Sequence, residues 1–323
     1  MKIDTHNHAI PEPLLQLLRE TPSYGVVVES HRLILHGRAV IPLDRSFHVP
    51  SAKLAELTAN GLEGAVISIA PPVFLYQGDP QASRELCRVA NLGLAEFAAV
   101  DPFRMRWMAH VPMGVPDQVT EIAEEALSAG AVGIEVASAT ADRSLDDPAY
   151  DPLWDVAERR GVPVFIHPAG EVDYSGLNDF YLQNVIGNQF QTTVAVERLI
   201  CAGVLDRFPR LRILLAHAGG YFPFQAGRLR HAAEVKAELA DAPKDPWAYS
   251  RQIFVDTITH DTPALAYLVA RMGVGNVVLG TDLPFSMATR LPLESLLAAT
   301  DARTVEEVAE NNPARLFSFS PTG

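Results

Sequence analysis

The chain has 323 residues, of which 48% are hydrophobic and 20% charged, so it can bury one large core. Its formal net charge is −13 and its Lys and Arg residues are scattered, which argues against nucleic acid as a partner. Since the first residues contain no apolar stretch of the kind found in secretory signals, we expect no such signal, and no apolar run approaches the ~20 residues of a membrane span. The two cysteines, Cys87 and Cys201, are too few for a disulfide framework, so we expect a soluble, cytoplasmic protein.

Short apolar runs alternate with longer amphipathic stretches along the chain. Continuous apolar runs are typical of parallel strands that are buried on both faces. In chain order, the expected strands are Lys2–His6, Ala65–Ala70, Trp107–Val111, Val132–Val136, Pro163–His167, Arg212–Ala216, Ile253–Thr257 and Asn276–Gly280. The expected helices between them include Pro116–Ala129, Pro152–Arg160, Gln191–Ala202 and Pro263–Arg271.

Glycines follow several of these helices, where a glycine commonly occupies the C′ position. They are Gly130, Gly161, Gly203 and Gly273. Eight strands with helices between them match the count of a closed (β/α)₈ TIM barrel. The main alternative is an open doubly wound sheet, which usually has fewer strands and a glycine-rich phosphate loop that this sequence lacks. We therefore predict an α/β fold of the TIM-barrel type.

One segment interrupts the alternation of strands and helices. Residues 24–50 follow the first strand and precede a helix expected at Ser51–Ala59, and they contain two short β-rich runs. We interpret them as a small β lobe inserted after strand one, at the end of the barrel where loops build active sites. Since no linker, repeat or low-complexity stretch is present, residues 1–323 are predicted to form a single domain.

The sequence Asp-Thr-His-Asn-His at residues 4–8 ends the first expected strand. Residues two apart on a strand point to the same side, so His6 and His8 can present two imidazoles to one metal ion. Two unrelated histidines on a surface turn are the alternative for any isolated pair of this kind.

Three further polar residues follow apolar strands. His167 ends the fifth strand, His217 follows the sixth and Asp282 follows the eighth. Barrel enzymes place catalytic residues at these carboxyl ends of the strands. A single residue of this kind could be a buried structural histidine, but agreement at four strand ends favours a shared site.

With these residues the sequence resembles the amidohydrolase superfamily. Its motifs are similar to those of the branch that contains aminocarboxymuconate semialdehyde decarboxylase, and they run nearly end to end. They read DTHNH, HPAG, AHAGG, GTDLPF and NNPARLF in this chain.

The resemblance implies a metal centre and an acid–base residue. The implied ligands are His6, His8, His167 and Asp282, and His217 is the implied base that takes a proton from metal-bound water. Neutral imidazoles and a carboxylate suit Zn²⁺ or another divalent ion, with one ion per subunit. The imidazole of His217 suits proton transfer near neutral pH. By the same resemblance, Asp282 is expected to contribute to catalysis as well as to metal binding.

The resemblance also implies a small carboxylate substrate. Arg228 matches an arginine that reaches the neighbouring subunit's site, which implies a homodimer, and Arg38 matches a second carboxylate-binding arginine. Guanidinium groups bind carboxylates through two hydrogen bonds. His110 and His260 follow strands three and seven and are candidate substrate contacts. Surface positions in solvent are the alternative for both arginines.

Several residues depart from the family pattern or extend it. Ala169 stands where the decarboxylase has a tryptophan, and Leu283 stands where it has an aromatic residue. These changes put that enzyme's own substrate in doubt. Glu135, at the end of strand four, is interpreted as a polar group behind the metal ligands or in the pocket, because the branch resembled is mononuclear.

The leading functional hypothesis is non-oxidative decarboxylation of a small unsaturated or aromatic carboxylic acid. Hydrolysis of an amide, lactone or ring bond is the main alternative, since the same metal and base would serve it, and hydration of a double bond is a third. A non-catalytic barrel with a structural metal would be expected to lose the base or a ligand, and none is lost. Motifs for organic cofactors, such as G-x-G-x-x-G or a P-loop, are absent.

Overall fold

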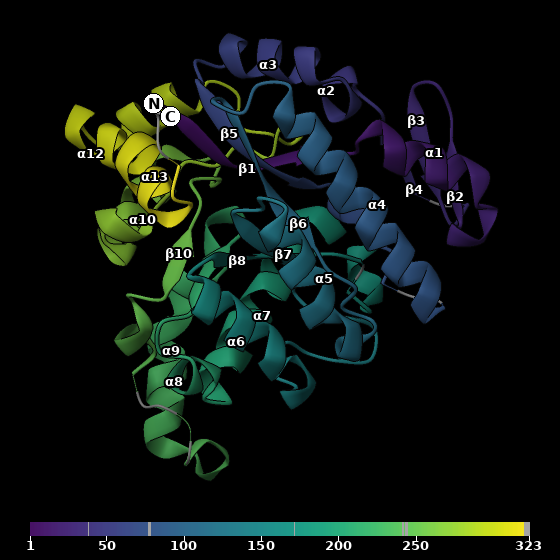
Figure 1. Ribbon diagram of the computed structural model, residues 1–323. Helices are drawn as coiled ribbons and strands as arrows, with labels where there is room; N and C mark the ends of the chain where they lie inside the picture. Colours follow the sequence, from purple (N-terminus) through teal and green to yellow (C-terminus); the bar gives the residue numbers. More distant parts are fainter. Residues whose placement is uncertain (38, 77–78, 171, 241, 243–244, 320–323) are drawn as a thin grey trace.

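The computed structural model of the protein describes residues 1–37, 39–76, 79–170, 172–240, 242 and 245–319. Its centre is a curled parallel sheet of seven strands, in which each strand pairs with the next one along the sheet (Figure 1). In sheet order the strands are β1 (Ile3–Ala9), β5 (Gly64–Ile69), β6 (Met105–His110), β7 (Gly133–Ala137), β8 (Pro163–His167), β9 (Arg212–Leu215) and β10 (Ile253–Val255). The predicted α/β class with parallel strands is confirmed.

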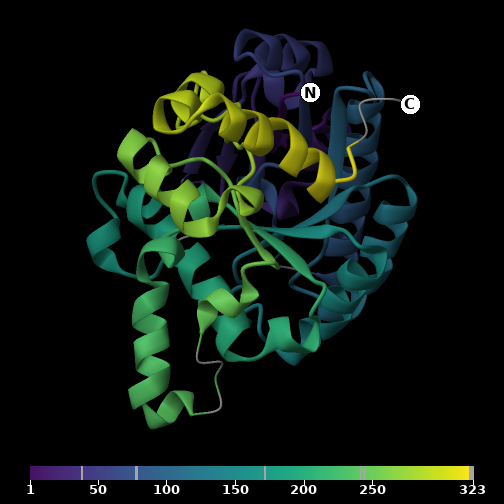
Figure 2. The ribbon, with the colours of Figure 1, turned by 90° about the vertical axis from the view of Figure 1, so that its left-hand side faces the viewer.

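Helices cover the outside of this sheet in both views (Figures 1 and 2). They are α1 (Glu12–Glu20), α2 (Arg45–His48), α3 (Pro50–Ala59), α4 (Pro80–Ala99), α5 (Pro116–Ser128), α6 (Asp151–Arg160), α7 (Asn188–Cys201), α8 (Val204–Arg207), α9 (Phe222–Val235), α10 (Thr262–Met272), α11 (Pro292–Ala299), α12 (Ala302–Glu306) and α13 (Asn312–Leu316). The four glycines predicted to end helices all have positive φ, which confirms that prediction. The N-terminal ammonium bonds Glu310 at 2.6 Å, so the first strand meets the C-terminal helices.

The expected eighth strand, Asn276–Gly280, is not a regular strand, and this part of the prediction is wrong. The segment from Val277 to Leu283 makes isolated parallel bridges to Val255 of β10 and to Asn7 of β1. Between these bridges, the Thr257 hydroxyl bonds the backbone N–H and C=O of Gly280, each at 3.2 Å. Side-chain hydrogen bonds therefore replace part of the ladder, and the segment still lies between the two edge strands of the sheet.

Three short antiparallel strands lie between α1 and α2. They are β2 (Val26–Val28), β3 (Arg32–Leu35) and β4 (Ala39–Pro42). The hydroxyl of Tyr24, just before β2, donates to the carbonyl of Ala82 in α4 at 2.8 Å. The small sheet therefore packs against the side of the molecule that α1 and α4 cover (Figure 1).

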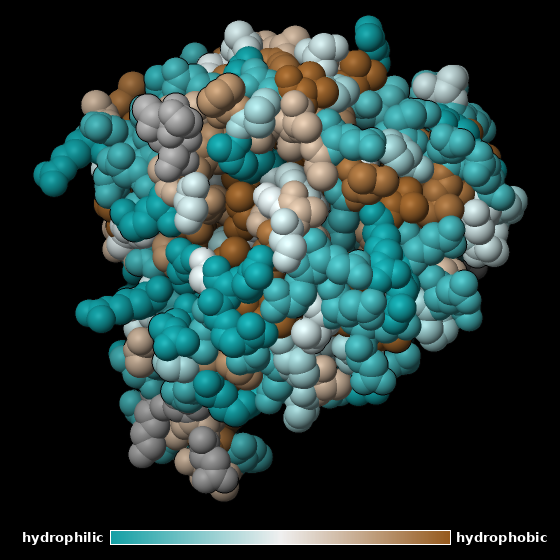
Figure 3. Space-filling view, in the orientation of Figure 1, coloured by the Kyte–Doolittle hydropathy of each residue, from teal (hydrophilic) through white to brown (hydrophobic). Residues whose placement is uncertain are grey.

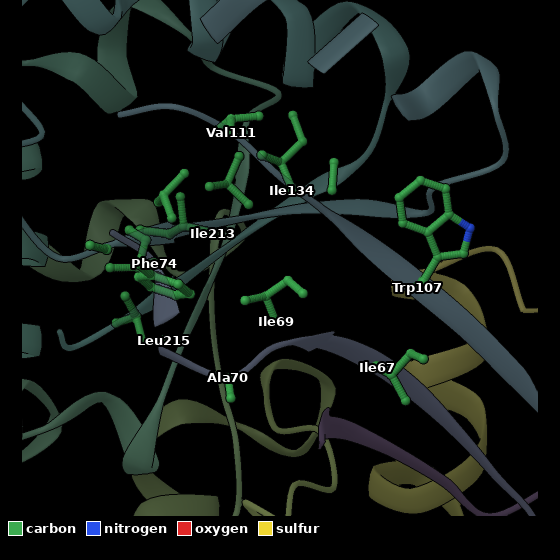
Figure 4. Packing of buried hydrophobic residues seen from close by; sticks show 14 of the residues in the cluster. Ile67, Ile69, Ala70, Phe74, Trp107, Val111, Ile134, Ile213 and Leu215 are labelled. Carbon is green, nitrogen blue, oxygen red and sulfur yellow. The ribbon is translucent and has the colours of Figure 1, made fainter. Parts of the chain in front are cut away.

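Alternation along the strands divides the buried residues into two sets. In β5, Ile67 and Ile69 face the surrounding helices, where they pack in the larger core with Trp107 and Ile134 (Figure 4). Val66 instead belongs to a second core that lies inside the curl of the sheet and includes Phe165. Because strand residues alternate between the faces, Ser68 and His167 also point inward, toward the ends of the strands.

The outer surface shown in Figure 3 is mainly hydrophilic, interrupted by separate hydrophobic areas. No helix in the described part of the chain is both long enough and apolar enough to cross a membrane.

Candidate metal centre and active site

Strand β1 turns two histidines toward the inside of the sheet. His6 and His8 are both fully buried, and their Nε2 atoms lie 3.0 Å apart. The pairing of β1 with β5 is irregular between Asp4 and Asn7. Despite this irregularity, the 3.0 Å separation shows that the two imidazoles lie on one side of the strand, as the spacing of two residues predicted.

Two more predicted residues complete a cluster at the carboxyl ends of the strands. His167 is the last residue of β8, and Asp282 lies near the end of the irregular segment, with its backbone held by a 2.8 Å bond from its N–H to the His6 carbonyl. Ligand atoms of His6, His8, His167 and Asp282 all lie within 4.8 Å of one another, and all four residues are buried. The structure thus brings together the four residues singled out from the sequence.

The distances within the cluster suit a single ion. Asp282 Oδ1 lies 3.4 Å from His6 Nε2 and 3.2 Å from His8 Nε2. Two ligand atoms that share a tetrahedral ion at ~2 Å lie about 3.3 Å apart. His167 Nδ1 bonds the Pro168 carbonyl at 2.7 Å, whereas its Nε2 has no hydrogen-bond partner among the described residues. Because a buried polar atom without a partner is costly, this nitrogen fits a metal ligand.

Neighbouring side chains orient the other two imidazoles. His6 Nδ1 bonds Oδ2 of Asp256 at 2.7 Å, and His8 Nδ1 lies 3.2 Å from the Ser68 hydroxyl. Ser68 in turn donates to Glu135 at 2.8 Å. In both rings the second nitrogen is engaged, which leaves Nε2 to face the centre of the cluster, as in metal sites whose ligands are held from behind.

The charges of the site also suit a cation. Burial lowers the pKa of His8 to about 4, and burial together with the neighbouring histidines lowers the pKa of His167 well below its ordinary value. Both rings are therefore neutral, which is the state that binds metals. Burial lowers the pKa of His6 too, but Asp256 and Asp282 outweigh it and raise that pKa to about 10. The carboxylates beside His6 thus favour positive charge at the cluster, and a divalent ion can supply it.

His217 lies beside the cluster on a tight turn after β9. Its ring centroid is 5.0 Å from that of His167 and 5.1 Å from that of His6, and its Nε2 lies 3.8 Å from Asp282 Oδ2. Its φ is 54°, and the turn continues through Gly220, where a Cβ atom would lie 2.4 Å from the carbonyl oxygen of Gln189. Only glycine fits at that position, so steric crowding explains the last glycine of the AHAGG motif.

The sequence pattern that defines the amidohydrolase family matches residues 3–319. The chain belongs to the amidohydrolase family. Among related proteins, it is 29% identical to the 2-amino-3-carboxymuconate-6-semialdehyde decarboxylase of Dictyostelium discoideum, over 99% of this chain and 92% of that protein. It is 26% identical to a gamma-resorcylate decarboxylase of Rhizobium radiobacter, over 85% of this chain and 89% of that protein. The resemblance to this superfamily and branch is thereby confirmed.

Solved structures share the fold of this amidohydrolase. The 5-carboxyvanillate decarboxylase of Sphingomonas paucimobilis has a TM-score of 0.83 at 24% identity, and the match covers 99% of each chain. A dihydroxybenzoic acid decarboxylase from Polaromonas sp. JS666 has a TM-score of 0.79 at 21% identity, with 98% of this chain and 96% of that chain covered. That structure holds manganese and the inhibitor 2-nitroresorcinol. In this amidohydrolase, His6, His8, His167 and Asp282 form a donor set that could hold a metal ion.

The predicted substrate-binding residues lie in different surroundings. Arg38 is outside the described residues. Arg228 is exposed on α9, and His260 is exposed after β10 with a φ of 56°. His110 is fully buried, and its ring stacks on Tyr76 at a centroid distance of 5.4 Å. Their roles toward a substrate stay predictions.

The two departures from the family pattern also lie in different surroundings. Leu283 is fully buried in the core, whereas Ala169 is half-buried and donates its N–H to Gln191 Oε1 at 3.2 Å. Phe285, whose ring lies 5.4 Å from that of His8, is a further residue at the site that was not predicted. It is the last residue of the GTDLPF motif, so the motif was the signal that could have found it.

Two further residues near the site were missed. Asp256 directly follows β10 and bonds His6, and its position at the end of an apolar strand resembles that of His167. Tyr181 lies in the loop after β8 with a φ of 62°, and burial together with the charge of Asp282 raises its pKa. For Tyr181 the sequence offers no signal, because it follows neither a strand nor a recognisable motif.

Proposed function

We propose that this amidohydrolase is a metal-dependent, non-oxidative decarboxylase of a small unsaturated or aromatic carboxylic acid. The observation that carries the proposal is the cluster of His6, His8, His167 and Asp282 with His217 beside its carboxylate. The related proteins named above are decarboxylases, which supports the same reaction.

The reaction exchanges a carboxyl group for a proton. The C–C bond to the carboxyl group breaks, CO₂ leaves, and the electron pair that stays on carbon takes up a proton, so no oxidant or reductant is needed. When bound, a divalent ion supplies a Lewis acid that holds anionic oxygens and lowers the pKa of a water molecule to about 7. His217 is the residue that we assign to carry the proton, because its Nε2 is near the cluster and, among the described residues, the other imidazoles of the cluster all belong to the proposed ligand set.

We propose that one ion binds per subunit and that it is zinc. Three imidazole nitrogens and one carboxylate form a donor set typical of zinc, which takes a further ligand by becoming five-coordinate. Manganese in the Polaromonas structure is the competing assignment. Elemental analysis of the protein as isolated distinguishes the two, and a predominance of manganese would overturn the zinc assignment.

The proposal extends to the architecture that holds the site. We take the fold as a closed (β/α)₈ TIM barrel and a single domain, in which the segment from Val277 to Leu283 serves as the eighth member. Its hydrogen bonds to β10 and β1 support this closure. Strands β2 to β4 are then the lobe inserted after β1, and Arg38 is the carboxylate-binding residue that we assign to it.

Because Cys87 and Cys201 are unpaired thiols, we also propose a cytoplasmic location.

We further propose a homodimer in which Arg228 contributes to the partner's site. Exposed hydrophobic side chains cluster on α7, α9 and the turn before α7, and we call them the α7–α9 face; they are Val185, Ile186, Phe190, Val194, Tyr221 and Phe224. The Tyr221 N–H donates to Thr193 of α7 at 2.8 Å, so the two helices adjoin. Arg228 is exposed four residues after Phe224, on the same side of α9. An exposed apolar face of this kind is typical of a protein interface.

A panel of substrates tests the reaction. Muconate-like acids, hydroxybenzoates and cyclic amides are incubated with the metal-loaded protein, and CO₂ release is measured against simple hydrolysis. We expect CO₂ release from at least one unsaturated or aromatic acid. Ring opening or amide cleavage without CO₂ would replace decarboxylation with hydrolysis as the function.

A further inference from the structure

The carboxylate of Asp256 accepts four hydrogen bonds, two on each oxygen. Oδ2 accepts from His6 Nδ1 at 2.7 Å and from the backbone N–H of His217 at 2.8 Å. Oδ1 accepts from the backbone N–H groups of Ala218 at 2.7 Å and of Ile258 at 3.0 Å. Asp256 is fully buried. All the acceptor sites of an ionised carboxylate are therefore used.

This pattern determines which nitrogen of His6 carries the proton. The other three donors to Asp256 are backbone N–H groups, which can only donate, so the carboxylate acts purely as an acceptor. His6 Nδ1 must therefore carry a hydrogen. Nε2, which faces His8 and Asp282, is then the ring nitrogen that can give up its proton and bind a metal.

The same carboxylate holds the turn that carries His217. His217 and Ala218 have φ values of 54° and 59°, a left-handed conformation that is strained for residues with a Cβ atom. Their two N–H groups both point at Asp256. Hydrogen bonds to a buried charge can hold such a turn, and without them two buried donors would lose their partner.

The chain packs closely against Asp256 and His6 at Gly280. A Cβ atom on Gly280 would lie 2.7 Å from the Cβ of Asp256 and 2.9 Å from the Cβ of His6. The glycine of the GTDLPF motif therefore lets the chain pass close behind both residues.

We propose that Asp256 is a positioning residue that couples the metal centre to the acid–base residue. It sets the tautomer of His6 for metal binding, and it holds the left-handed turn that brings His217 to the cluster. The inference rests on the proposed function, in which these two histidines have those roles.

An amide cannot replace this carboxylate. The side chain of asparagine has a single acceptor oxygen, and its NH₂ group can only donate. In one orientation it keeps the bonds to His6 and His217 and turns the NH₂ group toward the N–H groups of Ala218 and Ile258. In the other it faces His6 Nδ1 with a donor, and the proton of His6 is driven to Nε2. Either way two of the four bonds are lost, although volume hardly changes.

The test compares the wild-type protein with Asp256→Asn. Affinity for Zn²⁺ is measured by competition with a chelator, and we expect it to fall on the order of 10- to 100-fold. In zinc-loaded protein with ¹⁵N-labelled histidine, NMR shows which nitrogen of His6 carries the proton, with His6→Gln used for assignment. We expect a proton on Nδ1 in the wild type, and its loss in the variant where the NH₂ group faces His6. In either orientation one amide of the turn loses its acceptor, so amide hydrogen exchange in the variant should become faster at Ala218 or at His217.

Glu135→Gln is the matched control. Glu135 is a fully buried carboxyl group that bonds Ser68 and bonds neither His6 nor His217. We expect the His6 ring signals and the exchange of the two amides to stay as in the wild type. If they changed as in Asp256→Asn, loss of any buried carboxyl would explain the effect and the inference would be wrong.

Two further outcomes keep the inference separate from the proposed function. If Asp256→Asn folds and keeps wild-type zinc affinity and wild-type amide exchange at both His217 and Ala218, the inference fails while the metal site stands. If the wild-type protein binds no divalent ion, the proposed function fails instead. Should the variant not fold, the wild-type spectra still decide, because a His6 proton on Nε2, or rapid exchange of the His217 and Ala218 amides, would overturn the inference.

Discussion

Asp282 presents one carboxylate oxygen to His217 and the other to the histidines of the cluster. Its Oδ2 lies 3.8 Å from His217 Nε2, whereas its Oδ1 lies 3.2 Å from His8 Nε2 and 3.4 Å from His6 Nε2. Burial raises the pKa of this carboxyl, but its contacts with the three imidazoles outweigh burial and hold the pKa well below the ordinary value. Asp282 therefore stays ionised between the proposed ligands and the proposed acid–base residue.

Replacing this charge should remove the metal. In Asp282→Asn the neutral amide cannot balance a divalent ion, and we expect metal affinity to fall by at least ~10-fold, as for changes around metal ligands in general. Elemental analysis after dialysis measures the bound metal. Asp301→Asn is the control, because Asp301 caps α12 by bonding the Thr304 N–H at 2.8 Å and lies outside the cluster. Full metal occupancy in Asp282→Asn would refute the ligand assignment.

Replacing His217 should stop turnover and spare the metal. We choose His217→Asn because φ is 54° at this position and asparagine adopts the left-handed conformation more readily than alanine. Loss of a positioned acid–base group typically lowers kcat by ~10²–10⁴-fold. Steady-state kinetics and elemental analysis are measured on the same preparation. Turnover at the wild-type rate would contradict the assignment of His217.

Truncation of Arg228 should weaken substrate binding in a dimer. A lost charge-assisted hydrogen bond costs about 1.5–3 kcal/mol, so we expect Arg228→Ala to raise KM by roughly 10- to 150-fold. Arg230→Ala is the matched control, since Arg230 is also exposed on α9 but two residues further along. Light scattering during size-exclusion chromatography measures the oligomeric state. A fully active monomer would rule out a role across subunits.

Lys53 offers a prediction about pH and stability away from the cluster. Its side chain is fully buried in α3, and burial lowers its pKa from 10.5 to about 8 despite Glu56 at 3.4 Å. At 1.36 kcal/mol per pKa unit, this difference corresponds to about 3 kcal/mol of destabilisation by the buried charge. Lys53→Met removes the charge, so we expect the free energy of unfolding at pH 7 to rise by up to about that amount.

The pH dependence distinguishes this effect from simple repacking. Below pH 8 Lys53 is charged in both the folded and unfolded states, so the full cost of burying the charge applies. Between pH 8 and 10.5 the folded protein releases the proton first, and the stability of the wild type rises with pH. The advantage of Lys53→Met, measured by urea unfolding, should therefore shrink across this range. An advantage that is equal at pH 7 and pH 10.5 would show that the charge is not its cause.

The sequence by itself determined the order of the elements and the residues of the cluster. Buried parallel strands show as apolar runs, and a polar side chain directly after such a run stands out, as His167 and Asp282 do. Both signals are local, so they need no knowledge of the folded chain. The same reasoning failed for the expected strand at Asn276–Gly280, because the hydroxyl of Thr257 takes over hydrogen bonds that a strand partner would make.

Only the tertiary structure decided which groups act on one another. Asp256 meets His6 across 250 positions of sequence, and one carboxylate thereby contacts a proposed ligand and the turn of the proposed base. Likewise, nothing in the helical pattern around Lys53 indicates that its ammonium is fully enclosed. Burial and hydrogen-bond partners depend on contacts between distant segments, so they arise only when the sheet curls and brings the ends of its strands together.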